Sequence, residues 1–147
     1  MFTRIVVGTD GSDTAAEAVR QAIDLAKISS ATLSIVSAFA PVSKRRVQVE
    51  AEGAPPDIAY EIGPREDVLL VLDAAAAEAR AAGVEVQTHP VEADPADALL
   101  NVAEQIKADL IVVGNKGMTG TRRYFLGSVP NNVSHHAPCS VLIIQTT

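Results

Sequence analysis

The sequence predicts an α/β fold, an open, doubly wound parallel sheet of five strands with helices on both faces. Short runs of Val, Ile and Leu alternate with segments whose apolar residues recur every three or four positions, a pattern typical of alternating strands and amphipathic helices. The strict alternation of strands with helices favours parallel strands joined by right-handed crossovers. Residues 5–7 and 110–113 are apolar on both faces and belong at the centre, which gives the strand order 3-2-1-4-5.

The first strand and the first helix are predicted within residues 5–28. Residues 5–7 are β-branched and are followed by a glycine-bounded turn over residues 8–11, which indicates a buried strand and its end. The first helix is expected over residues 14–28, with Thr14 and Glu17 fitting a capping box at its start. Its inward stripe consists of Val19, Ala22, Ile23 and Ala26.

A long connection separates the second strand, at residues 33–38, from the second helix. Residues 40–63 hold three prolines and two glycines, and connections of this length are usually lids, binding loops or disordered segments. The helix is expected to begin near Pro64 and to end at Gly83, with Val68, Leu72, Ala75 and Ala79 inward. Residues 84–87 alternate in polarity and predict a third strand at an edge of the sheet.

The remaining elements complete a Rossmann-like alternation. Asp94 and Pro95 are expected to start a third helix, whose inward residues are Leu99, Val102, Ala103 and Ile106. The fourth strand is predicted at residues 110–113, and a glycine-spaced loop follows it. A short helix near residues 129–136 and a last strand at residues 141–144 end the chain.

Composition limits the function classes. At 147 residues the chain is expected to be one domain, residues 1–147. Its 18 acidic and 12 basic residues give a formal charge of −6, which disfavours a nucleic-acid partner. No window is apolar enough to span a membrane, and the start of the chain does not resemble a signal peptide. Cys139 is the only cysteine, which fits a reducing compartment, so a cytoplasmic location is expected.

Two glycine-containing loops are predicted to face each other across one cleft. In this strand order the ligand crevice lies beyond the carboxyl ends of strands 1 and 4, where the order reverses. The first strand is followed by Gly8, Thr9, Asp10 and Gly11. The fourth is followed by Gly114, Asn115, Lys116 and Gly117. The sequence therefore predicts a binding site assembled from loops that are far apart in the chain.

The second loop has features of a phosphate site. It continues through Met118 and Gly120 to Gly127 and Ser128, and then opens onto the helix near Val129. Free amides at a helix start and small residues beside them suit an anion. Glycines that only form turns and a Ser128 that only caps the helix explain the pattern about equally well. Pro130 removes one amide from the first helical turn.

Asp10 has three possible roles. A carboxylate at a strand end can bind Mg²⁺ together with phosphate oxygens, accept a hydrogen bond from a base or ribose, or hold its own turn as an Asx motif. The turn role is compatible with either of the others. No set of residues can be assigned as a catalytic triad, and Asp10 is the only evident base for activating water.

The spacing G-x2-G-x9-G-[ST], from Gly114 to Ser128, resembles that of the universal stress protein family. Residues 5–12 and 136–144 are similar to the two ends of that family as well. The resemblance implies ATP binding, with Gly114, Gly117, Gly127 and Ser128 at the phosphates and ribose, and Asp10 and Ala38 beside the adenine or ribose. Some members resemble cyclic-nucleotide binders, so both ATP and cyclic AMP (cAMP) stay open. The full candidate nucleotide-binding set is Gly8, Thr9, Asp10, Gly11, Ala38, Gly114, Asn115, Lys116, Gly117, Met118, Gly120, Gly127, Ser128 and Val129.

The expected function is therefore that of a cytoplasmic, adenine-nucleotide-binding regulator of a stress response, with Mg²⁺ as a possible companion of the ligand. Two alternatives remain. One is a slow ATPase or nucleotidyl-transfer enzyme that uses the same cleft. The other is an interaction module that binds no nucleotide and whose glycines are structural.

The last strand predicts a homodimer. Val141, Leu142, Ile143 and Ile144 are apolar on both faces of an edge strand that carries no protective charge or proline. Two copies related by a twofold axis can pair this strand with itself, which satisfies the backbone and covers the side chains. Dimers of this kind are also what the family resemblance implies.

Overall fold

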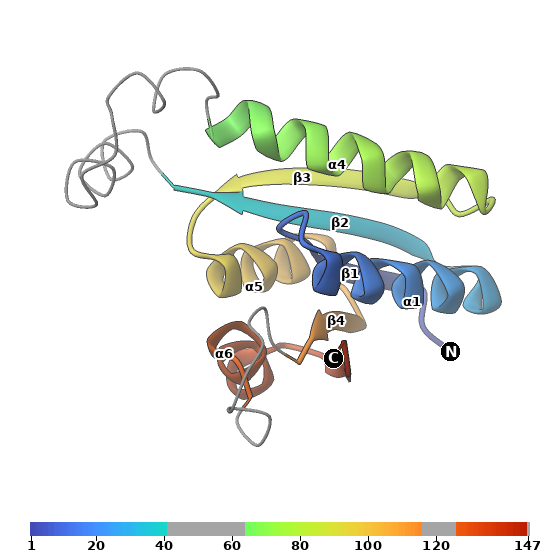
Figure 1. The fold of residues 1–147 in the computed structure, drawn as a ribbon. Helices are drawn as coiled ribbons and strands as arrows, with labels where there is room; N and C mark the ends of the chain where they lie inside the picture. The colour runs from blue at the N-terminus through green and yellow to red at the C-terminus, as the bar shows by residue number, and fades with distance from the viewer. Residues whose placement is uncertain (41–63, 116–125, 147) are drawn as a thin grey trace.

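The computed structural model describes residues 1–40, 64–115 and 126–146, and the predicted alternation of strands and helices is confirmed in them (Figure 1). In chain order the elements are β1 (Arg4–Gly8), α1 (Asp13–Ser29), β2 (Thr32–Phe39), α4 (Pro64–Ala81), β3 (Val86–Glu92), α5 (Pro95–Ile106), β4 (Leu110–Gly114), α6 (Ser128–His136) and β5 (Ser140–Ile144). No helix within the described ranges combines the length and apolarity that a membrane crossing requires.

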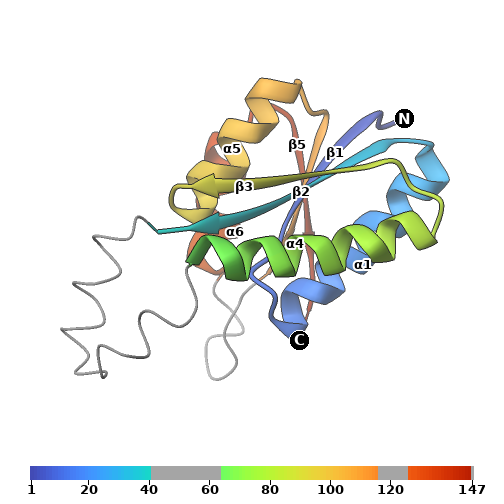
Figure 2. The ribbon, with the colours of Figure 1, turned by 90° about the horizontal axis from the view of Figure 1, so that it is seen from above.

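The five strands form one parallel sheet in the order β3-β2-β1-β4-β5, as predicted. Helices α1 and α4 cover one face, and α5 and α6 cover the other (Figure 2). Two apolar layers result. Ile5 and Val7 of β1 pack toward α1 and α4, whereas Val6 between them packs toward α5. This alternation is the reason that the central strands are apolar at every position.

The third strand differs from its prediction. It runs from Val86 to Glu92 and not over residues 84–87. Gly83 has a φ of +80°, and the amide of Val84 bonds back to Ala79 at the end of α4, so these residues belong to the helix end. The strand then continues through Pro90, because an edge strand tolerates a residue without an N–H.

The start of α1 differs from its prediction, whereas the predicted start of α5 at Asp94 and Pro95 is confirmed. The N-cap of α1 is Ser12, whose Oγ accepts the amide of Ala15 at 3.2 Å, so the capping box at Thr14 and Glu17 is wrong. The turn closed by Asp10 places Ser12, and not Thr14, at the N-cap position. Asp94 does stand at the N-cap of α5, but its side chain makes no capping bond.

The two edges of the sheet have opposite character. At one edge, β3 carries Pro90 and the exposed Glu92. At the other, β5 pairs only with β4 within the described chain, and the side chains of Leu142 and Ile143 are 38% and 37% exposed. Val141 and Ile144 pack against the core, whereas Leu142 and Ile143 stay exposed, and no strand in the described part of the chain pairs with the outer edge of β5.

Candidate functional site

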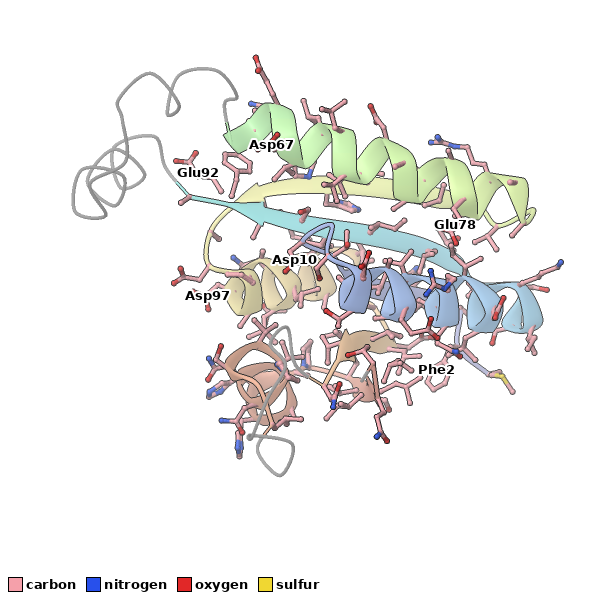
Figure 3. The ribbon with its side chains drawn as sticks, viewed as in Figure 1. Phe2, Asp10, Asp67, Glu78, Glu92 and Asp97 are labelled. Carbon is pink, nitrogen blue, oxygen red and sulfur yellow. The ribbon has the colours of Figure 1, made fainter. Side chains whose placement is uncertain are left out.

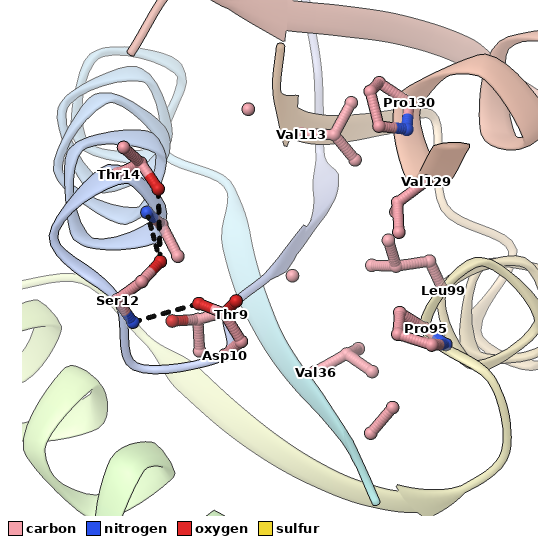
Figure 4. A pocket seen from close by; sticks show the side chains of 14 residues that line it. Thr9, Asp10, Ser12, Thr14, Val36, Pro95, Leu99, Val113, Val129 and Pro130 are labelled. Atoms are coloured by element: carbon pink, nitrogen blue, oxygen red, sulfur yellow. Dashed lines mark hydrogen bonds between the residues drawn. The ribbon is translucent and has the colours of Figure 1, made fainter. Parts of the chain in front are cut away.

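A pocket of about 180 Å³ lies at the carboxyl ends of β1 and β4, where the strand order reverses (Figure 4). β1 leads into α1 on one face of the sheet, and β4 is followed by α6 on the other, so the two connections diverge and leave a crevice. The lining residues are Gly8, Thr9, Asp10, Ser12, Thr14, Ala15, Val36, Ala38, Pro95, Leu99, Val113, Gly114, Val129 and Pro130.

The structure brings together part of the candidate set. The candidates that line the pocket are Gly8, Thr9, Asp10, Ala38, Gly114 and Val129. Those that are described but do not line it are Gly11, Asn115, Gly127 and Ser128. Lys116, Gly117, Met118 and Gly120 lie outside the described residues. So do Arg122 and Arg123, two adjacent basic residues that could neutralise a polyphosphate or be exposed loop charges.

The turn after β1 is fixed by its own side chains (Figure 4). Oδ1 of Asp10 accepts the amide of Ser12 at 2.9 Å, and Oγ1 of Thr9 accepts the amide of Gly11 at 3.1 Å. The Asx-turn role of Asp10 is therefore confirmed. Its other oxygen, Oδ2, has no hydrogen bond within the described chain, and the residue is exposed, so Asp10 can also reach a ligand.

Gly11 serves the turn and not the pocket wall. Its φ is +83°, a conformation that favours glycine, and a Cβ atom there would lie 2.8 Å from Cγ2 of Val71 on α4. The turn after β1 is thus packed closely against the first half of α4.

Asn115 joins three elements at the far side of the pocket. Its amide donates to the carbonyl of Ile144 at 2.8 Å, and its carbonyl accepts the amide of Gly127 at 3.0 Å. Its side-chain Oδ1 accepts both the amide of Thr146, at 3.0 Å, and the Thr146 hydroxyl, at 2.9 Å. The two ends of the glycine-spaced segment, residues 115 and 127, therefore meet.

The start of α6 offers two backbone donors. The N-cap is Gly127 and Ser128 is the first helical residue, so the interpretation of Ser128 as the cap is wrong. Gly127 already donates to Asn115, and Pro130 has no N–H. The amides of Ser128 and Val129 are the first-turn donors left without an acceptor among the described residues.

Four carboxylates lie toward this end of the molecule (Figure 3). Figure 3 shows Asp10, Asp67, Glu92 and Asp97 toward the end where the strands finish, whereas Glu78 lies toward the other end. Asp67 and Asp97 occupy the first turns of their helices, where the macrodipole favours a negative charge. No Lys or Arg stands among the described lining residues. Within the described part of the pocket, only backbone amides and hydroxyls can therefore bind an anion.

A magnesium site at Asp10 stays a prediction. The described residues contain no group of three or more His, Cys, Asp or Glu side chains placed to hold a metal ion. A cation at Asp10 would therefore need oxygens from the nucleotide itself to complete its coordination, which is how Mg²⁺ usually binds beside phosphates.

Several lining residues were not predicted. Val36 lies three residues before the end of the second strand, and it reaches the pocket because it pairs with Gly8, the last residue of β1. The register of the two strands, which the sequence does not give, was needed to find it. Leu99 was predicted to be inward on its helix, and it is 3% exposed, but the same side chain also forms a wall of the pocket. Helical periodicity identifies a buried residue without showing that it borders a cavity.

Comparison with known proteins places the chain among close relatives. The model of the Universal stress protein family matches residues 1–145. A universal stress protein of Mycobacterium tuberculosis is 39% identical over 147 residues, which cover 99% of this chain and 98% of that relative.

Solved structures agree in fold. A universal stress protein in complex with cAMP has a TM-score of 0.75 and 35% sequence identity, over 99% of this chain and 98% of that one. A protein of the same family from Burkholderia pseudomallei has a TM-score of 0.70 and 32% identity, over 97% of this chain and 95% of that one.

Proposed function

The chain belongs to the universal stress protein family, and from this premise we propose that it is a cytoplasmic regulator of a stress response that binds an adenine nucleotide, ATP or cAMP. One observation carries the proposal. The pocket at the strand-order reversal is lined by residues of both predicted glycine loops, Asp10 and Gly114 among them. The similar protein in complex with cAMP supports the ligand class.

The proposed ligand has its phosphate toward the start of α6. There the amides of Ser128 and Val129 point outward from the positive end of the helix dipole, and Gly114 lines the pocket nearby with its missing Cβ directed at Thr146. The base and ribose are assigned to the opposite wall, beside Asp10 and Ala38. The apolar side chains of that region suit a flat aromatic base.

The proposal includes a homodimer formed through β5. The exposed side chains of Leu142 and Ile143 lie on a strand with an unpaired edge, and a twofold copy would pair the backbone and cover them. This arrangement needs no change in the rest of the fold.

Ligand identification is the test of the proposed function. The protein is purified without added nucleotide, denatured, and the released small molecules are identified by mass spectrometry. Calorimetric titration with ATP and with cAMP, each with and without Mg²⁺, then ranks the ligands. A free nucleotide concentration of 100 times the dissociation constant would add about 2.7 kcal/mol to the free energy of unfolding. If neither nucleotide binds or shifts the melting temperature, the interaction-module alternative is supported.

Hydrolysis is tested separately from binding. Turnover of ATP by the purified protein is compared with that of Asp10→Asn, in which the amide oxygen still accepts the Ser12 amide but the charge is lost. Loss of turnover with retained binding would support the slow-enzyme alternative, with Asp10 as the base or metal ligand. Absence of turnover in both proteins would support a regulator that only binds its ligand.

A further inference from the structure

We propose that Asn115 is a positioning residue, which holds the start of α6 in place for the ligand and depends for this on Thr146, a residue outside the pocket. The inference rests on the proposed function. It also assigns Asn115, a candidate nucleotide contact in the sequence, a different role.

The hydrogen bonds of Asn115 divide into two groups. The backbone carbonyl accepts the amide of Gly127, the N-cap of α6, at 3.0 Å. The backbone amide binds the carbonyl of Ile144, the last residue of β5, and the side-chain Oδ1 binds both donors of Thr146, just beyond that strand. One residue thus connects the end of β5 with the start of α6.

The residues on either side of Asn115 and Gly127 explain why this connection matters to a ligand. Gly114 precedes Asn115 and lines the pocket, and Val129, two residues after Gly127, lines it too. Neither Asn115 nor Thr146 does. A rotation of the Asn115 peptide would therefore move the amides of Ser128 and Val129 relative to Gly114 without altering any lining side chain.

The side chain of Asn115 fixes that peptide. Its Oδ1 accepts two donors from a residue 31 positions away, which limits the rotation of the side chain and of the backbone that carries it. Asn115 and Thr146 are both half-buried, so the loss of one partner leaves polar groups partly shielded from water. The contact is therefore maintained in the folded protein.

The decisive variants lie at Thr146, because that residue does not line the pocket. Thr146→Val removes the hydroxyl and keeps the shape, whereas Thr146→Ser keeps the hydroxyl. A matched control is Thr3→Val, which removes a hydroxyl that donates to Asp109 at the same 2.9 Å near the opposite end of the sheet. Asn115→Ala, alone and combined with Thr146→Val, completes the set.

Two quantities are measured for each variant. One is the affinity for whichever of ATP or cAMP the wild-type protein binds. The other is the hydrogen-exchange rate of the Gly127 amide by NMR, which reports on its bond to Asn115 and needs no ligand. We expect Thr146→Val to weaken binding about three- to tenfold, the equivalent of one net hydrogen bond, and to speed the exchange of Gly127 by a similar factor. Thr146→Ser and Thr3→Val should leave both quantities within about twofold of wild type.

The combined variant should bind no more weakly than Asn115→Ala alone, since both changes break the same connection. The inference is overturned if Thr146→Val behaves like Thr3→Val in both measurements. It is also overturned if Asn115→Ala weakens binding while Thr146→Val leaves it unchanged, because Asn115 would then act on the ligand without Thr146. If the wild-type protein binds no adenine nucleotide, the proposed function fails, and the exchange of Gly127 alone decides whether Thr146 positions α6.

Discussion

Gly8 of β1 and Leu99 of α5 are packed so closely that a Cβ atom at position 8 would lie 3.1 Å from both δ carbons of Leu99. Both residues line the pocket. We expect Gly8→Val to reduce nucleotide affinity more than tenfold, because its γ carbons must enter the pocket or displace Leu99. Isothermal titration calorimetry measures the loss.

The control for this variant is Gly83→Ala. Gly83 has a left-handed backbone conformation, with a φ of +80°, but nothing lies within 4 Å of its missing Cβ. Its replacement should cost about 1 kcal/mol of unfolding free energy and leave affinity unchanged. Equal losses of affinity in both variants would show that Gly8→Val acts through general destabilisation.

Ser12 and Ser128 should respond differently to replacement by alanine. Ser12 is a true side-chain cap, so Ser12→Ala is expected to lower the unfolding free energy of the ligand-free protein by about 1 kcal/mol. Ser128 is the first residue of its helix, so Ser128→Ala should change that free energy by less than about 0.5 kcal/mol. Urea denaturation compares the two. A loss of about 1 kcal/mol in Ser128→Ala would contradict the assignment of Gly127 as the N-cap.

The sequence was sufficient for the fold because the central strands are buried on both faces. Residues 5–7 and 110–113 consist of Ile, Val and Leu alone, which indicates central strands. Their central position predicts the strand order, and the strand order predicts the location of the pocket. The extent of the third strand could not be predicted, since Pro90 argues against a strand unless its edge position is already known.

Long-range contacts account for what the sequence did not predict at the site. Nothing local to Asn115 indicates that its side chain binds Thr146, and the glycine motif instead places Asn115 with the ligand contacts. The choice of Ser12 over Thr14 as the cap likewise depends on how the turn at Asp10 is closed. Spacing identifies which loops meet, and tertiary contacts decide what each residue in them does.

Asp109 should make stability depend on pH in the acid range. Burial alone would raise the pKa of this carboxyl, but hydrogen bonds from the amides of Thr3 and Arg4 and from the Thr3 hydroxyl lower it overall. A lowered folded-state pKa stabilises the protein above the unfolded value, about 3.9, and this stabilisation is lost as the pH falls through the folded value. The gap in unfolding free energy between wild type and Asp109→Asn should therefore be widest near neutral pH.

Chemical denaturation at a series of pH values tests this prediction, with Asp73→Asn on the exposed side of α4 as the control for a lost charge. A gap for Asp109→Asn that stayed constant down to about pH 3 would show that the hydrogen bonds do not favour the ionised carboxylate.

Lys107 ends α5 in a left-handed conformation, with a φ of 54°, that strains a residue bearing a Cβ. We expect Lys107→Gly to raise the unfolding free energy by about 0.5 to 1 kcal/mol, because relief of strain exceeds the added entropy of the unfolded chain. Lys107→Ala keeps the Cβ and serves as the control for loss of the side chain. Thermal denaturation should show a gain for glycine only, and a similar gain for alanine would assign the effect to the charge.

Ile143→Lys tests the proposed dimer. It places a charge on the exposed apolar strand β5, and the copies would bring two such charges together near the twofold axis. Sedimentation velocity should then show a monomer. Glu92→Lys puts the same charge on the opposite edge and should leave the dimer intact. A wild-type monomer at micromolar concentration, or a dimer that survives Ile143→Lys, would exclude the β5 interface.

The unlike edges of the sheet also determine how far such an assembly can grow. When β5 pairs with its copy, the joined sheet has β3 at both of its outer limits. There Pro90 has no amide hydrogen with which to bind a further strand. The charged side chain of Glu92 would lose water if another strand packed beside it. Each chain can be extended on one side only. If the proposed β5 dimer forms, these residues disfavour the addition of a further strand to β3, and we expect association by this route to stop at two copies.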